Sequence, residues 1–452
     1  MKSQTQKFFM FLGDYSMLQL SLLVTIFIRY GNSFTNLVWW QHIVSFTWLF
    51  IVWCIVFYAW DLYSLIRKWS HKNYFFAIVM NVFISMGLFY IVPQFGITPK
   101  TNLILQSIIF TVLFYFWRFI FNKVFNYIGH IKNVVIIGGD ENSLLLVKSL
   151  HKNHKLGYKP VAILLDKEIN KPEEIINKGT VLFRDIEKLE QFISQNEIHT
   201  VVISENWYQS IKRNLYDLIP QKINFYNISS FWEEYNRTIP IYATNEIWFL
   251  ENLRGSSKEF FEVIKRLEDI LLSLIMLPII LPLSIIAAFL VKITSKGPIL
   301  YSQIRIGKGG KEYRIYKFRS MKIDAEKYGA QWSTKNDPRV TKVGRFLRAT
   351  RIDEFPQLFN VLKGDMSLIG PRPERPEFVK ELVKQIPHYN LRHLVKPGLT
   401  GWAQVNMEYT DTISDTGRKL EYDLYYLKNR NPILDFKILL KTVMTVFTGS
   451  GR

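Results

Sequence analysis

Four long apolar stretches near the start of the chain constrain its fold more than any other feature. They cover residues 8–28, 43–60, 74–94 and 101–121. Each approaches the roughly 20 residues that a helix needs to cross the hydrocarbon core of a bilayer. Basic residues cluster before the first stretch, between the second and third, and after the fourth. The positive-inside rule therefore predicts four membrane-spanning helices with both ends of the bundle at the cytoplasmic face.

The first apolar stretch is expected to be retained, because it contains Asp14 and lacks a small-residue cleavage site. Asp14 itself is either a functional intramembrane carboxylate or a helix-packing residue. The single cysteine, Cys54, rules out an intrachain disulfide and a cysteine zinc cluster. These features are typical of a protein whose soluble parts lie in a reducing cytosol.

Short β-branched runs separated by helical stretches follow the apolar region. The runs cover residues 133–137, 161–165, 199–204 and 223–229, and this alternation is typical of a parallel sheet in a Rossmann-like βαβ domain. Gly138 and Gly139 follow the first run, where a dinucleotide fingerprint would lie, but Asp140 and Ser143 occupy positions where that pattern requires glycine. The sequence leaves a nucleotide-binding role and a structural or regulatory role open.

A further apolar stretch, residues 270–291, contains Pro278 and Pro282 and has basic residues at both ends. Its length permits a full crossing of the membrane. Each proline removes a backbone donor and bends a helix, so a re-entrant hairpin that returns to the cytoplasmic side is the alternative. The stretch by itself does not choose between these two topologies.

The chain has a formal net charge of +19, which predicts anionic partners. Thirteen basic and four acidic side chains lie between residues 301 and 350. Directly after a membrane-associated helix, such a segment can bind anionic membrane lipid. No groove-reading motif accompanies the charge, so nucleic acid is not an expected partner.

Two adjacent acids, Asp353 and Glu354, stand next to this basic segment. Apolar residues at 355, 358, 359 and 362 have helical spacing, which predicts an amphipathic helix over 353–363 that ends near Gly364. The acids then lie in its first turn, where the helix dipole and nearby arginines, among them Arg348, favour ionised carboxylates. Such a pair is either a helix cap or a nucleophile beside a metal ligand.

A proline-locked turn, Gly370-Pro371-Arg372-Pro373, follows that helix. Both prolines restrict the backbone, so Arg372 is held in one direction, which suits bidentate recognition of phosphate. A carboxylate nucleophile, a second carboxylate able to bind Mg²⁺, and arginines for developing charge are the parts that phosphoryl transfer requires. A second constrained turn, residues 396–402, is either a basic binding turn or a core turn.

These motifs resemble the monotopic phosphoglycosyl transferases, the bacterial sugar transferase family. The resemblance runs from about 258 to 448 and rests on motifs that include KFRSM at 317–321, DEFPQ at 353–357, NVLKGDMSLIGPRP at 360–373 and KPGLTGWAQV at 396–405. The apolar helices and βαβ domain further resemble the large members, polyprenyl-phosphate hexose-1-phosphate transferases. These members start exopolysaccharide, capsule or O-antigen assembly.

The resemblance implies that Asp353 attacks the β-phosphorus of a UDP-sugar, releasing UMP, and that undecaprenyl phosphate then takes the sugar phosphate. It implies that Glu354 binds Mg²⁺ and that Arg348, Arg372 and Arg319 contact substrate phosphate. The family's re-entrant helix breaks at Ser-Pro, whereas this chain has Leu281-Pro282. Because UDP-sugars are cytosolic, the resemblance favours the re-entrant hairpin over a full crossing.

The expected fold class is therefore a membrane protein of α plus α/β type with three domains. A four-helix transmembrane bundle covers 1–128, a Rossmann-like βαβ domain covers 129–250, and an α-rich catalytic domain covers 251–452 with a re-entrant helix at 265–293. The expected location is the bacterial inner membrane, with catalysis at the cytoplasmic face. A homodimer is compatible with this arrangement, and glucose or galactose is the preferred sugar.

Two other functions remain open at this point. The first is a membrane scaffold that binds anionic lipid without turnover; the intact pair of acids with Arg348 and Arg372 argues against it. The second is a glycosyltransferase that transfers the sugar without its phosphate, which would release UDP in place of UMP.

Overall fold

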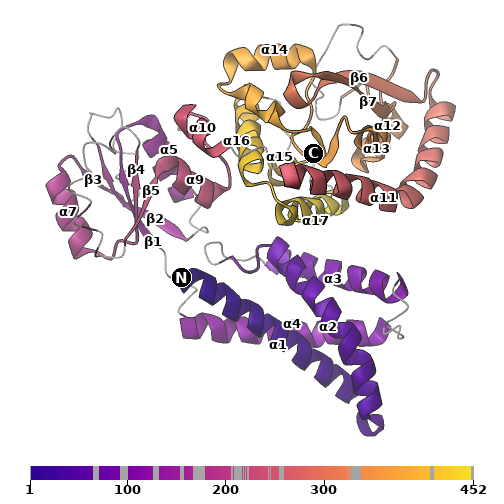
Figure 1. Ribbon diagram of the computed structural model, residues 1–452, viewed down its shortest axis with the longest axis horizontal. Helices are drawn as coiled ribbons and strands as arrows, with labels where there is room; N and C mark the ends of the chain where they lie inside the picture. Colours follow the sequence, from indigo (N-terminus) through magenta and orange to yellow (C-terminus); the bar gives the residue numbers. More distant parts are fainter. Residues whose placement is uncertain are drawn as a thin grey trace. The chain divides into compact units, whose positions relative to one another are not determined.

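The computed structural model divides into two compact units, Met1–Ile228 and Ser229–Arg452. It describes residues 2–64, 71–91, 100–125, 132–152, 157–165, 179–204, 223–242, 246–253, 259–323, 337–407 and 412–448, with isolated positions between some of these ranges. Figure 1 shows the elements of both units with their labels.

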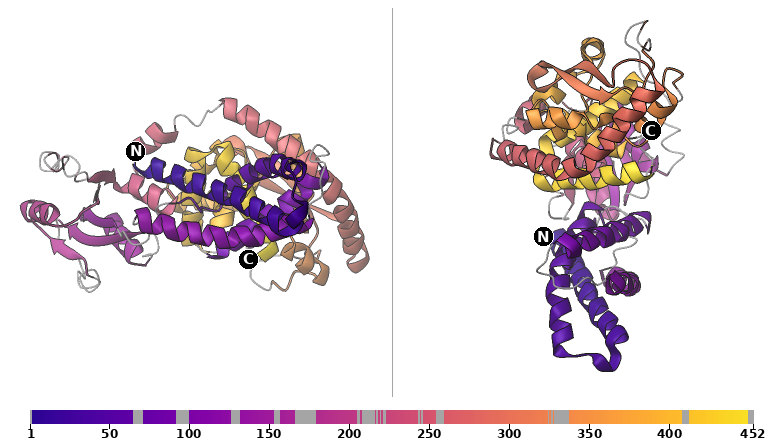
Figure 2. Two further views of the ribbon diagram at one scale, coloured as in Figure 1. Left: turned by 90° about the horizontal axis from the view of Figure 1, so that it is seen from below. Right: turned by 90° about the vertical axis from the view of Figure 1, so that its right-hand side faces the viewer.

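The first unit begins with four long helices, α1 (Lys2–Tyr30), α2 (Asn36–Ala59), α3 (His71–Ile91) and α4 (Lys100–Phe125), with a 3-10 turn, η1 (Gly31–Ser33), after α1. All four are long and apolar enough to cross a membrane. The helices contact one another in the pairs α1/α4, α1/α2, α2/α3 and α3/α4. The four helices predicted from hydropathy are therefore present, and their side-by-side packing is visible in Figure 2.

A buried ion pair joins α1 to α4. The Arg118 Nη2 atom lies 2.6 Å from Asp14 Oδ2, and both side chains are buried. Gly13 lies directly against the Trp117 indole, where a Cβ atom would come within 2.0 Å of the ring. A charged residue among apolar helices is stabilised when an opposite charge meets it there. The structure thus places Asp14 in a helix-packing contact.

The second part of this unit is a parallel sheet in the order β3-β2-β1-β4-β5. Its strands are β1 (Lys132–Ile137), β2 (Tyr158–Leu164), β3 (Val181–Phe183), β4 (Thr200–Ile203) and β5 (Asn224–Asn227). Helices α5 (Glu141–Lys152) and α7 (Ile186–Gln195) accompany the sheet (Figure 1). The predicted runs correspond to β1, β2, β4 and β5. Strand β3 was not predicted from the sequence, because it is only three residues long and half-exposed.

Asp140 occupies the point where the strand order reverses between β1 and β4. Its Oδ1 atom accepts hydrogen bonds from the Ser143 amide, at 2.8 Å, and from the Ser143 hydroxyl, at 2.5 Å. Its Oδ2 atom accepts from the Ser204 hydroxyl at 2.5 Å. In doubly wound sheets this crevice is where ligands bind. Here a carboxylate of the chain itself fills the start of α5, which favours the structural role for the Gly138 segment.

The second unit begins at Ser229 and therefore includes most of α9 (Ile228–Asn236) and all of α10 (Glu246–Leu253). The Glu233 carboxylate lies 2.7 Å from Lys428 Nζ, and Trp402 Nε1 donates to the Arg237 carbonyl at 3.1 Å. Because these contacts bind the segment to later residues, it packs with the C-terminal unit. The expected boundary between residues 250 and 251 therefore lies later in the chain than the division between the two units, which follows Ile228.

Helix α11 (Glu259–Thr294) contains Pro278 and Pro282 and is long and apolar enough to cross a membrane. Figures 1 and 2 show it bent into two arms. Prolines inside a helix remove backbone hydrogen bonds and cause such bends. Most apolar side chains of its middle part are exposed, including Ile279, Leu281 and Ile285. A bent apolar helix is compatible with both topologies considered for this segment.

The rest of the second unit combines helices with two small sheets. An antiparallel hairpin is formed by β6 (Leu300–Ile306) and β7 (Glu312–Phe318), which flank the turn η7 (Lys308–Gly310), and a parallel pair by β8 (Ser367–Ile369) and β9 (Gly398–Thr400). The helical elements are α12 (Lys342–Ala349), η8 (Ile352–Glu354), α13 (Gln357–Lys363), α14 (Pro376–Gln385), η9 (Tyr389–Leu394), α15 (Trp402–Asn406), α16 (Ile413–Asn429) and α17 (Pro432–Thr448). A common apolar core that includes Val361, Met366 and Leu424 joins most of them, while Leu347 of α12 packs in a second cluster with Val291 of α11 and Phe318 of β7.

Candidate active site

The acidic pair lies in a 3-10 turn before the helix that the sequence predicted to contain it. Arg351 has a left-handed backbone (φ 60°) and precedes η8, which contains Asp353 and Glu354; regular helix begins only at Gln357. The prediction of one helix over 353–363 was therefore wrong at its start. Pro356 lacks an amide hydrogen, so it fits at the start of a helix, where no backbone hydrogen bond is lost. The residues before it form 3-10 hydrogen bonds, in which an amide donates to the carbonyl three residues earlier, such as Phe355 N to Ile352 O at 3.1 Å.

The end of α13 is as predicted. Gly364 adopts a left-handed conformation (φ 97°), and its amide donates to the carbonyl oxygens of Asn360 and Val361. Glycine is favoured at this position because a side chain would be strained there. The short helix between Pro356 and Gly364 thus has both ends determined by local sequence, which holds the preceding acidic turn in place.

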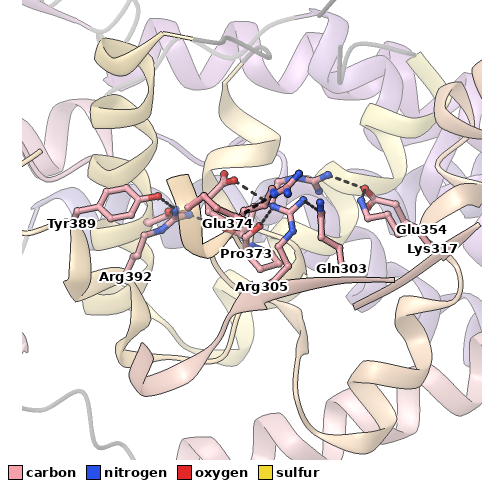
Figure 3. Close-up of polar contacts among 12 residues, drawn as sticks. Gln303, Arg305, Lys317, Glu354, Pro373, Glu374, Tyr389 and Arg392 are labelled. Atoms are coloured by element: carbon pink, nitrogen blue, oxygen red, sulfur yellow. Dashed lines mark hydrogen bonds and ion pairs between the residues drawn. The ribbon is translucent and has the colours of Figure 1, made fainter. Parts of the chain in front are cut away.

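Glu354 is buried between two cations. Its Oε1 atom lies 3.0 Å from Lys317 Nζ on β7 and 2.8 Å from Arg372 Nη2. Figure 3 shows Glu354 and Lys317 next to each other. Burial by itself would raise the pKa of Glu354, but the charges of Arg372 and Lys317 outweigh it and hold the pKa well below its usual range. Glu354 is therefore ionised at neutral pH.

Asp353 has a different environment, although it is the adjacent residue. Its side chain is 6% exposed, and among the residues that the structure describes, no group donates a hydrogen bond to Oδ1. Burial, and then the charge of Glu354, raise the pKa of Asp353, while Lys317, Arg348 and Arg351 oppose that shift. A buried carboxylate oxygen without a donor costs free energy. This oxygen is therefore available to a ligand or a reacting atom.

Arg348 approaches the pair from α12. Thr341 caps this helix, and Gly344 lies so close to Ser320 that a Cβ atom would come within 1.9 Å of the Ser320 carbonyl oxygen. The close contact holds α12 against the end of β7, where Arg348 Nε donates to the Ser320 hydroxyl at 2.8 Å. Its positive charge is among those that act on Asp353. The structure thus brings together Asp353, Glu354, Arg348 and Arg372.

Arg319 lies in a different environment from these four. Its Nη2 atom donates to the carbonyl and the hydroxyl of Ser295, at 2.8 and 2.7 Å, just after the end of α11. Gly297 passes beside it, and a Cβ atom there would lie 2.4 Å from Arg319 Nη1. Arg319 therefore joins the end of the apolar helix to β7. Its contact with substrate phosphate stays a prediction.

Lys317 was not among the site residues proposed from the sequence. The sequence feature that could have indicated Lys317 was its position in the KFRSM motif at 317–321. It is, however, one of thirteen basic residues between positions 301 and 350, and nothing in the sequence distinguishes it from the others. The residue becomes recognisable only when β7 pairs with β6 and brings Lys317 to Glu354, 37 positions later in the chain. Burial lowers the pKa of Lys317, and the charge of Glu354 opposes that shift.

The residues fit a magnesium site of a limited kind. No group of three or more His, Cys, Asp or Glu side chains able to hold a metal occurs within the described ranges. Mg²⁺ commonly binds through one or two carboxylates together with substrate phosphates and water, so such a group is not required. Glu354 supplies a carboxylate for such a site, next to Asp353, whose Oδ1 atom has no donor among the described residues. The cations on Glu354 Oε1 would compete with a metal at that atom.

Two protein families match this chain. Residues 260–449 match the family described as Bacterial sugar transferase, and residues 70–213 match the family described as CoA-binding domain. The acidic pair, Lys317, Arg348 and Arg372 all lie within the first match. The second match covers part of the apolar helices and much of the parallel sheet.

Several curated proteins are similar to the chain. An Aeromonas hydrophila protein named UDP-N-acetylgalactosamine-undecaprenyl-phosphate N-acetylgalactosaminephosphotransferase is 49% identical over 203 residues, which cover 44% of this chain and 48% of that protein. The Exopolysaccharide production protein PSS of Rhizobium leguminosarum bv. phaseoli is 40% identical over 199 residues, 42% of this chain and 98% of that protein. The chain thus spans about half the length of the first relative and nearly all of the second.

A third relative extends the similarity into the N-terminal region. The UDP-glucose:undecaprenyl-phosphate glucose-1-phosphate transferase of Escherichia coli (strain K12) is 34% identical over 339 residues, which cover 72% of this chain and 69% of that protein. Apolar helices and relatives of this kind indicate a membrane protein. Similarity over more than two thirds of both chains, together with the family match around the acidic pair, shows that this chain belongs to the bacterial sugar transferase family, the undecaprenyl-phosphate sugar phosphotransferases.

Proposed function

We propose that this protein transfers a hexose-1-phosphate from a UDP-sugar to undecaprenyl phosphate, forming undecaprenyl-diphosphate-sugar and UMP. The observation that carries the proposal is the asymmetry of the acidic pair. Glu354 is neutralised by Lys317 and Arg372, whereas Asp353 has a buried oxygen without a donor among the described residues. A carboxylate in this state can act as a nucleophile toward phosphorus.

In the first step, Asp353 Oδ1 attacks the β-phosphorus of the UDP-sugar. A bond forms between this oxygen and the β-phosphorus, and the bond from the β-phosphorus to the bridging oxygen breaks. UMP leaves with that electron pair, and the sugar phosphate is held on Asp353 as an acyl phosphate. Partial desolvation of the carboxylate by the protein favours attack, because less bound water must be displaced.

In the second step, a phosphate oxygen of undecaprenyl phosphate attacks the same phosphorus. The bond from phosphorus to Asp353 breaks, the carboxylate is restored, and the lipid diphosphate sugar is released. Both steps place negative charge on the phosphoryl oxygens. Arg348 and Arg372 lie on elements that meet at the pair and would stabilise this charge.

Glu354 has two tasks in this proposal. It holds Arg372 and Lys317 at the site through its Oε1 atom. It would also hold Mg²⁺, which, when bound, supplies charge neutralisation for the diphosphate of the donor. Arg319 is proposed as a further phosphate contact from the neighbouring end of β7.

The reaction is tested by incubating the purified full chain in nanodiscs with Mg²⁺, undecaprenyl phosphate and a panel of UDP-sugars, followed by assay of the nucleotide. UMP released with one sugar, and not by Asp353→Ala, is the expected result. UDP in place of UMP would indicate transfer of the sugar alone. No nucleotide from folded protein would favour a lipid-binding scaffold.

The donor sugar is to be decided by the same panel. The relatives in Escherichia coli and Aeromonas hydrophila are named for UDP-glucose and UDP-N-acetylgalactosamine, and they are 34% and 49% identical to this chain. The panel therefore includes UDP-glucose, UDP-galactose and both UDP-N-acetylhexosamines. By analogy with the named relative in Rhizobium leguminosarum, the product would enter exopolysaccharide synthesis.

We further propose that α11 is re-entrant and that the catalytic unit lies at the cytoplasmic face of the inner membrane. The bend in α11 and its two internal prolines are compatible with this topology, and the cytosolic location of UDP-sugars favours it over a full crossing. In a Cys54→Ser background, a cysteine at the exposed position Lys380 should resist impermeant thiol reagents added to intact cells. A cysteine at exposed Asn32, expected outside, is the matched positive control. Labelling at 380 equal to that at 32 would favour a full crossing.

A further inference from the structure

The turn that carries Arg372 has four consecutive carbonyl groups, at residues 371–374, and each accepts a hydrogen bond from a different donor. The Gly398 amide donates to Pro371 O at 2.9 Å, and the Ile306 amide donates to Glu374 O at 3.0 Å. The two carbonyls between them are held by side chains. Arg392 Nη2 donates to Arg372 O at 2.9 Å, and Arg305 Nη1 donates to Pro373 O at 3.0 Å.

The Arg392 side chain is held on several sides. It is 5% exposed, and its Nη1 atom donates to the Tyr389 hydroxyl at 2.5 Å. Its Nη2 atom also lies 2.8 Å from Asp423 Oδ2 on α16. Figure 3 shows Tyr389 and Arg392 next to each other, on the opposite side of the cluster from Glu354 and Lys317. The guanidinium therefore has little freedom to leave the Arg372 carbonyl.

Arg305 is held in a similar way from β6. Its Nη2 atom donates to Gln303 Oε1 at 2.7 Å, and its Nη1 atom lies 3.5 Å from the Glu374 carboxylate. Figure 3 shows Arg305 between Gln303 and the Pro373–Glu374 backbone. Within the described part of the chain, neither Arg305 nor Arg392 makes a hydrogen bond to Asp353 or Glu354.

We propose that Arg305 and Arg392 are positioning residues that act through Arg372. They hold the carbonyl of Arg372 and the carbonyl that follows it, so the Arg372 side chain keeps its direction toward Glu354, 2.8 Å away. Burying the Arg392 guanidinium and much of the Arg305 side chain to hold one turn costs desolvation free energy. A small displacement of a charge-stabilising group costs up to about 10²-fold in rate, which makes such a clamp useful.

The proposal rests on the proposed function, and a double-mutant cycle tests it. The full chain is assayed for UMP release as wild type, Arg392→Met, Arg372→Ala and the combination. Arg392→Met should lower kcat by roughly 10- to 100-fold and change KM for the UDP-sugar less. In the Arg372→Ala background, the same substitution should cost less than about threefold, because the residue it positions is already absent. Arg305→Met should behave in the same way.

Arg430→Met is the matched control. Arg430 is also a buried arginine of the same unit, but it pairs with Glu262 at the start of α11 and not with the turn. Any decrease in kcat that Arg430→Met causes should be the same in the wild-type and Arg372→Ala backgrounds. If the Arg392→Met loss were likewise equal in both backgrounds, Arg392 would be a structural residue and the proposal would be overturned.

A second measurement does not depend on activity. Arg372→Ala and Glu354→Gln, singly and combined, give the coupling between these two residues as shifts in thermal unfolding midpoint. This coupling should shrink when Arg392 is replaced by methionine and persist when Arg430 is replaced. A wild-type chain that releases no nucleotide would overturn the proposed function, and the unfolding cycle would then decide on the clamp by itself.

Discussion

Asp140 and Asp353 both precede a helix, in different units of the chain, and their carboxylate oxygens differ in the number of hydrogen bonds they accept. Asp140 accepts hydrogen bonds on both carboxylate oxygens, from Ser143 and Ser204. Asp353 lies in η8 with one buried oxygen that has no donor within the described residues. The first aspartate completes a hydrogen-bonded network, and the second has an oxygen that can act as the proposed nucleophile.

The contrast shows why position by itself is a poor guide to role. A helix start favours an anion wherever it occurs, because backbone amides and the dipole point toward it. In the sheet, the carboxylate itself fills the place where a ligand phosphate would lie in related folds. In the catalytic unit, the favourable charges go to Glu354, and burial keeps the pKa of Asp353 raised. The two aspartates thus have similar positions but different numbers of hydrogen-bond donors.

Replacing Asp353 by asparagine should remove turnover, by more than about 10³-fold, since the nucleophilic oxygen is lost. The same variant should unfold at an equal or higher temperature. In the wild type, burial raises the pKa of Asp353, so the ionised carboxylate lowers the stability of the folded state at neutral pH. The neutral asparagine side chain avoids this cost. UMP release and thermal unfolding measure the two effects.

Asp415→Asn is the control for that substitution, because Asp415 also lies in the first turn of a helix, α16. Its turnover should stay within about twofold of wild type, as is usual for a partly exposed residue away from the site. A folded Asp353→Asn variant with wild-type turnover would remove the contrast between the two aspartates.

Glu354→Gln should slow UMP release by roughly 10²- to 10³-fold and increase the Mg²⁺ concentration needed for half-maximal rate. The neutral amide would no longer hold Lys317 and Arg372 by charge. Glu381→Gln, which alters an exposed ion pair with Lys384, is the control. An unchanged magnesium titration in Glu354→Gln would exclude Glu354 from the metal site.

Asp140→Ala should lower the stability of the sheet by about 1–2 kcal/mol, because a helix cap and buried hydroxyl partners are lost. Turnover in the folded variant should remain within about twofold. Asp185→Ala, which removes the single capping bond to Glu187 at the start of α7, is the matched control and should cost about 0.5–1 kcal/mol. A large loss of turnover in Asp140→Ala with unchanged stability would contradict a structural role for Asp140.

The pH dependence provides a finer test of Asp353. The acid limb of kcat/KM should report this residue, because only the ionised carboxylate attacks. Arg351 is one of the charges that oppose the rise in the pKa of Asp353. Arg351→Asn keeps a residue that tolerates the left-handed backbone and removes the charge, so the acid limb should move to higher pH. Arg351→Lys keeps the charge and should leave the acid limb at the wild-type pH. If the acid limb lay at the same pH in both variants, it would belong to a group other than Asp353.

Much of the fold could be predicted from the sequence. The helices α1 to α4 and four of the five strands of the parallel sheet follow from apolar runs and β-branched runs, which are local patterns. The hairpin β6–β7 was not predicted, because its basic residues were interpreted as a membrane-binding segment. Seven cross-strand pairs, from Leu300–Phe318 to Ile306–Glu312, form it. Such pairing depends on a partner strand and not on composition.

The candidate site divides in the same way. Asp353, Glu354, Arg348 and Arg372 lie within 25 consecutive residues, so motifs and proline-restricted turns were enough to select them as candidates. Lys317, Arg305 and Arg392 join the site from β7, β6 and η9. Their contacts to Glu354 and to the turn at 371–374 cross 20 to 68 positions of the chain. No local pattern marks such a residue among many other bases.

By itself, the sequence determined which residue types stand next to one another: two acids before a proline, an arginine between two prolines, and glycines where helices end. These features follow from local backbone chemistry. Only the tertiary structure decided which carboxylate is neutralised and which is left with a buried oxygen that has no donor. Desolvation and hydrogen-bond satisfaction depend on every group that surrounds an atom, and those groups come together only when distant segments pack.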